Sequence, residues 1–162
     1  AAMAKTLGCD VVLDPGPVDP AAPHRGSPDL RQQVLDATDG VGVDVAMEMA
    51  GFNNSVNNAI QITRRGGSVV LFGVQNADFV ISDFNRIIMN GLNLRAVVGR
   101  QIFQTWHMTQ ALLEHTGNGI ADAIYDVILN GGEGTITHIN DWDRAVFEGT
   151  IRNHPKALIS FE

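Results

Sequence analysis

Cysteine and long apolar runs are both scarce in this sequence. The single cysteine, Cys9, excludes an internal disulfide and a cysteine-cluster zinc site. The longest apolar runs, such as the one from Ser68 to Val74, fall far short of the roughly 20 residues that a bilayer span requires. The sequence starts without a basic-then-apolar signal segment. We therefore expect a cytoplasmic protein that has no membrane partner.

Positive charge is also in short supply. Lys and Arg number 11 against 18 Asp and Glu, which gives a formal net charge of -7. A surface of that sign repels phosphate backbones and anionic lipids. We expect no nucleic acid among the partners of this chain.

The common sequence motifs for binding phosphate, for binding metal and for a serine nucleophile are missing. The sequence has no GxGxxG loop and no P-loop, and Gly40-Val41-Gly42 follows a predicted helix instead of opening one. None of the five histidines forms an i, i+4 pair with another, and His107 and His115 lie about two turns apart on one predicted helix. No serine stands in a GxSxG elbow. We therefore assign no catalytic and no metal-binding residue.

The sequence does contain an alternation of short apolar strands and amphipathic helices. Its 162 residues, 44% of them hydrophobic, suffice for one ordinary domain with a core. Strands are predicted at residues 11–13, 43–51, 68–74 and 92–99, and helices at 1–8, 28–40, 54–65, 82–90 and 104–115. Such an alternation predicts an α/β fold in which helices cover both faces of a parallel sheet.

The tail from Gly117 onward follows a different pattern. It combines a strand-like run, a glycine-rich turn, a short helix and an apolar end, at residues 123–129, 131–134, 141–149 and 157–161. These pieces are too sparse to build a second core of their own.

Two other features carry interpretations that the structure can test. The segment from Pro15 to Pro28 holds five of the six prolines and is interpreted as a surface loop, tolerated as an insertion. Glu48 stands in a strand expected to be buried, where a carboxylate must be paired or hydrogen-bonded. Either it holds the loop at the carboxyl end of its strand, or it forms a salt bridge with Arg64 or Arg65.

Three predicted strands end in a glycine, namely Gly51, Gly73 and Gly99. Ligands of open parallel sheets lie at the carboxyl ends of the strands, and a glycine lets a ligand approach the backbone. A flat ring could be held there by main-chain groups and apolar side chains. The alternative is that these glycines only make turns.

The residues at those strand ends resemble the cofactor domain of the zinc-dependent medium-chain alcohol dehydrogenases. The resemblance rests on Met47–Gly51, Phe72–Val74 and Val98–Trp106, and the last stretch is most similar to the threonine dehydrogenases of that family. It implies a Rossmann fold that binds NAD. By position, Phe72, Gly73 and Val74 match one backbone stretch near the nicotinamide, and Val97 and Val98 match a second. Together with Gly51, these are the candidate cofactor-binding residues: Gly51, Phe72, Gly73, Val74, Val97 and Val98.

The same resemblance implies that parts of the family's structure are missing here. Its zinc ligands, glycine-rich turn and ribose-binding acid would precede residue 1. We thus expect residues 1–118 to be the second half of a Rossmann domain that lacks its first strands, and 119–162 to be a segment that returns to an absent catalytic domain. The uncovered edge would favour a homo-oligomer.

The resemblance also implies an activity for the intact protein. The parent enzyme would move a hydride from a small-molecule secondary alcohol to NAD, with zinc in the missing domain polarising the alkoxide. The chain alone is expected to be inactive and to bind NAD weakly or not at all. The alternatives are a polyol or sugar dehydrogenase of the same superfamily, and a non-catalytic binding module on this scaffold.

Overall fold

The computed structural model describes residues 2–74, 78–99 and 101–161. Ala1, predicted in the first helix, and Arg100, part of the family motif, lie outside the described residues. The chain divides into two compact units, one made of residues 11–99 and the other of residues 1–10 and 100–162. The domain boundary expected after residue 118 stays a prediction.

The unit 11–99 is built on a parallel sheet of three strands. The strands lie in the order β1-β2-β3, and both neighbouring pairs are parallel. Their bounds are Val43–Glu48 for β1, Thr63–Leu71 for β2 and Asn93–Ala96 for β3. The predicted α/β class with a parallel sheet is confirmed.

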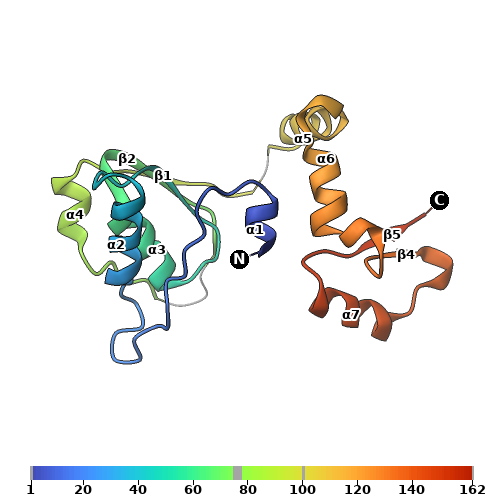
Figure 1. The fold of residues 1–162 in the computed structure, drawn as a ribbon, viewed down its shortest axis with the longest axis horizontal. Coiled ribbons are helices and arrows are strands. Elements are labelled where there is room, and N and C mark those ends of the chain that lie inside the picture. Colours follow the sequence, from blue (N-terminus) through green and yellow to red (C-terminus); the bar gives the residue numbers. More distant parts are fainter. Residues whose placement is uncertain (1, 75–77, 100, 162) are drawn as a thin grey trace. The chain divides into compact units, whose positions relative to one another are not determined.

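Three helices accompany this sheet in Figure 1: α2 (Pro28–Ala37), α3 (Asn53–Ile62) and α4 (Phe84–Met89). The helix start predicted at residue 28 is confirmed, and the Ser27 hydroxyl oxygen caps it by accepting a hydrogen bond from the Leu30 amide at 3.2 Å. Asp83 caps α4 in the same way, accepting from the Arg86 amide at 3.1 Å.

The core lies between α3 and one face of the sheet. Ile60 is its largest fully buried side chain, at 2% exposure. The other members of the cluster are Ala46, Val56, Ala59, Val69 and Leu92. On β1, Val45 and Met47 alternate with the buried residues and are exposed. Strand periodicity therefore sends one set of side chains into the core and leaves the other set uncovered.

The boundary between α3 and β2 differs from the prediction. The helix was expected to reach Arg65, but it ends at Ile62, and both arginines lie in β2. Thr63 is fully buried, and its hydroxyl donates to the Ala59 carbonyl at 2.6 Å. Between the pairs Val43–Thr63 and Val45–Ser68, β1 advances two residues while β2 advances five. This bulge accommodates the two arginines that were expected to end the helix.

Two predicted strands are wrong. Residues 11–13 form no strand, because a strand needs a hydrogen-bonding neighbour and the sheet pairs only β1, β2 and β3. The segment predicted as a strand at residues 123–129 is helical up to Ile128, with α6 at Ile120–Ala123 followed by a π-type turn at Ile124–Ile128. Short apolar runs do not distinguish a strand from a helix by periodicity.

The second unit is mainly helical. Two short parallel strands, β4 (Ile136–His138) and β5 (Leu158–Ser160), pair within it. Its other elements are α1 (Ala2–Thr6), α5 (Gln104–Glu114), α7 (Arg144–Asn153) and 3-10 turns at Thr116–Asn118, Asn130–Gly132 and Ile139–Asp141. Among the described residues, no helix combines the length and the apolar character needed to cross a bilayer.

Truncating Ile60 tests the assignment of the core. The change Ile60→Ala should lower the free energy of unfolding by about 3 kcal/mol, because it removes buried methyl groups and leaves a cavity. Ile88→Ala on α4 is the matched control, since that side chain is 62% exposed. Urea unfolding followed by far-UV circular dichroism measures both changes. Equal losses for the two variants would contradict the assignment.

Candidate functional site

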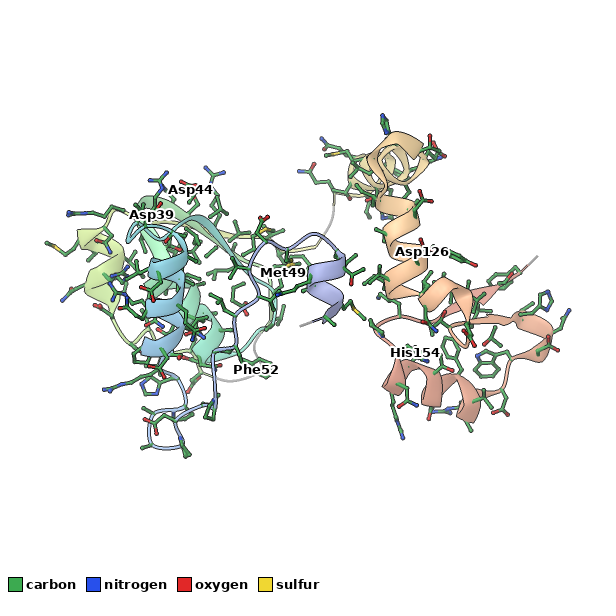
Figure 2. The ribbon with its side chains drawn as sticks, viewed as in Figure 1. Asp39, Asp44, Met49, Phe52, Asp126 and His154 are labelled. Atoms are coloured by element: carbon green, nitrogen blue, oxygen red, sulfur yellow. The ribbon has the colours of Figure 1, made fainter. Side chains whose placement is uncertain are left out.

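The candidate site is the carboxyl edge of the three-stranded sheet. Asp44 near the start of β1 and Met49 just beyond its end are labelled in Figure 2, and the site lies at the Met49 end. The amides of Phe72 and Gly73 both donate to the Glu48 carbonyl, at 2.9 and 3.2 Å. The Val97 amide donates to the Leu71 carbonyl at 2.9 Å. The ends of all three strands are therefore joined by backbone hydrogen bonds.

Gly51 and Gly73 touch each other at this edge. A Cβ placed on Gly73 would lie 2.1 Å from the Gly51 nitrogen, and one placed on Gly51 would lie 2.6 Å from the Val74 carbonyl oxygen. Gly51 also has a φ of +74°, in the left-handed region. Because only glycines allow this approach, the two segments after β1 and β2 share one compact surface.

The Glu48 carboxylate organises the loop between β1 and α3. Its side chain is 3% exposed. The Oε1 oxygen accepts hydrogen bonds from the Ala50 amide at 2.8 Å, the Gly51 amide at 2.8 Å and the Ser55 hydroxyl at 2.6 Å. The Ser55 hydroxyl in turn accepts from the Phe52 amide at 3.2 Å, at the start of α3.

These contacts decide between the two interpretations of Glu48. Arg64, one of its two suggested partners, forms its ion pair with Asp44 instead. Glu48 therefore holds the loop at the end of its strand. Its Oε2 oxygen is buried, has no hydrogen-bond partner among the described residues, and faces the position of a Gly73 Cβ at 2.7 Å.

The candidate cofactor residues divide by exposure. Gly51 is buried, whereas the side chains of Val74 and Val98 are 82% and 93% exposed. Phe72 and Val97 are about half exposed. The structure thus brings Gly51, Gly73 and Val74 into contact, with Val97 bonded to the neighbouring strand. Gly99, the third strand-end glycine, has no atom within 4 Å of its hypothetical Cβ.

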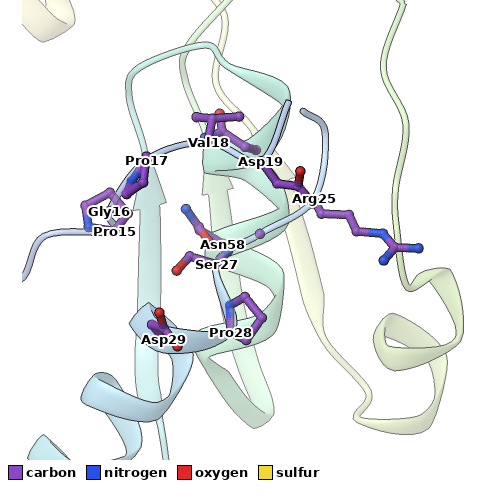
Figure 3. Close-up of a pocket in the computed structure, with 12 residues that line it drawn as sticks. Pro15, Gly16, Pro17, Val18, Asp19, Arg25, Ser27, Pro28, Asp29 and Asn58 are labelled. Carbon is purple, nitrogen blue, oxygen red and sulfur yellow. Dashed lines mark hydrogen bonds between the residues drawn. The ribbon is translucent and has the colours of Figure 1, made fainter. Parts of the chain in front are cut away.

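The proline-rich loop borders a cavity, shown in Figure 3. A cavity of about 290 Å³ lies between this loop, the start of α2, and Asn54 and Asn58 of α3. The loop is fastened to α3, because the Ser27 amide donates to Asn58 Oδ1 at 2.7 Å and Asn57 Nδ2 donates to the His24 carbonyl at 2.8 Å. Sequence reasoning missed this role of two adjacent asparagines, although their poor helix propensity is a usable signal.

Replacing Glu48 tests its role as the organiser of the edge. Glu48→Ala should lower the free energy of unfolding by at least about 2 kcal/mol, because it leaves buried backbone amides without an acceptor. Glu48→Gln should lose less, since its amide oxygen can still accept those bonds. Urea unfolding of the three proteins gives the comparison. Wild-type stability in the alanine variant would show that the loop does not depend on this carboxylate.

Comparison with known proteins supports the resemblance read from the strand ends. The model of the zinc-binding dehydrogenase family matches residues 1–118. An L-threonine 3-dehydrogenase from Francisella tularensis subsp. tularensis is 28% identical over 116 residues, which cover 69% of this chain and 31% of that protein. The chain therefore spans about a third of the length of such relatives.

Solved structures show the same fold. The 2R,3R-butanediol dehydrogenase from Bacillus subtilis superposes with a TM-score of 0.66 at 21% identity, covering 99% of this chain and 40% of that one. A mycobacterial protein complexed with NADPH gives a TM-score of 0.51 at 20% identity, covering 93% of this chain and 43% of that one. The expected partial Rossmann-type fold is confirmed. The chain belongs to the zinc-binding dehydrogenase family.

Proposed function

We propose that this chain forms the nicotinamide-facing part of the cofactor edge in an NAD-dependent alcohol dehydrogenase. The observation that carries the proposal is the contact between Gly51 and the Gly73–Val74 backbone at the carboxyl edge of the sheet. Parallel sheets bind their ligands at this edge. Family membership supports the dehydrogenase class.

The residues at the edge fit a flat, partly apolar ring. Gly73 offers backbone without a side chain, and the exposed side chains of Val74 and Val98 supply apolar surface at the strand ends. When bound, NAD accepts the hydride that leaves the alcohol carbon. The role of this chain is to position the ring and exclude water from one of its faces, while Glu48 keeps the edge in shape.

The described residues do not fit a zinc ion. Among residues 2–74, 78–99 and 101–161, no group of three or more His, Cys, Asp or Glu side chains could hold a metal. We therefore derive no step through zinc from this chain, and propose that the zinc of the parent enzyme is held by residues outside these 162.

The titration of the chain with NAD tests the proposed edge. We expect weak binding, with a Kd of about 1 mM or above, because this chain has no glycine-rich phosphate loop. Amide shifts in nitrogen-15 NMR spectra should cluster at Gly51, Gly73 and Val98, and Gly91 at the far end of β3 should stay unchanged. Shifts spread over the opposite edge would contradict the proposal.

A pair of glycine variants sharpens this titration. Gly73→Ala should abolish the NAD-induced shifts, because its new methyl group meets the Gly51 backbone. Gly149→Ala in α7 is the control, since no atom lies within 4 Å of its added Cβ and neither glycine has a positive φ.

For the substrate we propose L-threonine, with a vicinal diol as the second candidate. The first rests on the Francisella tularensis relative and the second on the similarity in fold to the butanediol dehydrogenase. Both compounds carry a secondary alcohol, which a dehydrogenase oxidises to a ketone. Spectrophotometric assays of NADH formation by the intact enzyme should show turnover of threonine well above that of 2,3-butanediol. The reverse order would discard the first assignment in favour of the second.

A further inference from the structure

A second cavity lies on the helical side of the unit 11–99, away from the carboxyl edge. It has a volume of about 200 Å³ and is lined by residues of α2, α3 and the start of α4. Two arginines line it, Arg31 from α2 and Arg86 from α4. The chain has a formal net charge of -7, with fewer Lys and Arg residues than Asp and Glu residues. Two arginines at one cavity therefore stand out against the overall charge.

Two hydrogen bonds hold Arg86 at this cavity. Its Nε donates to the Ile60 carbonyl at 3.2 Å and its Nη2 donates to the Thr63 carbonyl at 3.4 Å. These carbonyls lie at the carboxyl end of α3, where a cation is favourable. A guanidinium has five N–H donors, so the other N–H groups of Arg86 can donate to a ligand.

The charges around the cavity are not balanced. Among the described residues the ion pairs are Arg64–Asp44 and Arg144–Glu148, so neither arginine of the cavity has a carboxylate within 4 Å. Burial lowers the pKa of Arg86, the charge of Arg31 lowers it further, and Asp83 raises it. Asp83 is the acidic residue in the lining, and its Oδ1 accepts the Arg86 backbone amide.

The neutral side chains of the lining are already used to shape it. Asn57 Nδ2 donates to the Val80 carbonyl and Asn57 Oδ1 accepts the Ser82 amide, each at 2.8 Å. Gln61 Nε2 donates to the Ser27 carbonyl at 2.6 Å. The cavity is therefore built by side chains that fix the backbone around it, and the two guanidinium groups are the cations that face it.

We propose that this cavity binds a phosphate group between Arg31 and Arg86. Two guanidinium groups match a phosphate in charge, and their planar N–H pairs match its oxygens in geometry. A cavity of about 200 Å³ has room for a phosphate group. The ligand is inorganic phosphate or the phosphate of a small phosphomonoester, and this site goes beyond the proposed dehydrogenase function.

Titration of the 162-residue chain with inorganic phosphate tests the site. Potassium phosphate is compared with potassium chloride at the same ionic strength, because general screening affects both equally. We expect saturable binding, seen as a shift of the Arg86 Nε–H resonance in nitrogen-15 NMR spectra and as a rise in Tm. A response equal to that in chloride would overturn the proposal.

Variants separate a ligand site from a helix cap. Arg31→Gln should weaken phosphate binding at least about tenfold, because it removes a charged hydrogen bond. Arg152→Gln in the last turn of α7 makes the same change in charge and should leave binding unchanged. Arg86→Lys keeps the charge but loses the planar fork, and should also weaken binding. Unchanged binding in Arg31→Gln would reduce Arg86 to a cap of α3 and overturn the proposal.

Comparison of two probes identifies the source of the phosphate. Glycerol phosphate that binds more tightly than inorganic phosphate supports a phosphomonoester ligand, and equal or weaker binding supports free phosphate. Failure at this cavity leaves the NAD edge untouched, since Arg86 reaches the carboxyl end of α3 and Gly51 precedes its start.

Discussion

One carboxylate, that of Glu48, holds together the edge on which the proposed function depends. Its Oε1 oxygen binds two backbone amides and the Ser55 hydroxyl, which fixes the path of the chain from β1 into α3. With that path fixed, Gly51 meets Gly73, and the ends of β1 and β2 form one surface. A buried carboxylate is costly unless it is hydrogen-bonded, so the loop and the charge stabilise each other.

The helix α3 links this edge to the rest of the unit. Its start is fixed by Glu48 and Ser55, its buried face carries Ile60 into the core, and its carboxyl end receives the Arg86 guanidinium. Asn57 and Asn58 fasten the proline-rich loop to the same helix. Both cavities of the unit therefore have α3 as one wall. The proposed cofactor edge lies at the start of the same helix.

Much of this arrangement was predictable from local patterns. The strand at Val43, the helix start at Pro28 and the glycines after the strands follow from apolar runs and turn chemistry. The start of β2 was not predictable, because the bulge opposite Val43 is set by pairing between distant strands. The role of Glu48 was left open for a similar reason. The sequence does not show whether the Glu48 carboxylate lies closer to the Arg64 guanidinium or to the backbone amides of its own loop. The arginine pair was invisible, because Arg31 and Arg86 meet only in the folded unit.

A crystal structure of the intact protein with NAD bound tests the central claim most directly. We expect the nicotinamide ring to contact the backbone of Phe72–Val74 and the side chain of Val98, with Gly51 packed against Gly73 behind it. A ring bound elsewhere on the sheet, or a gap between the two glycines wide enough for a side chain, would contradict the claim.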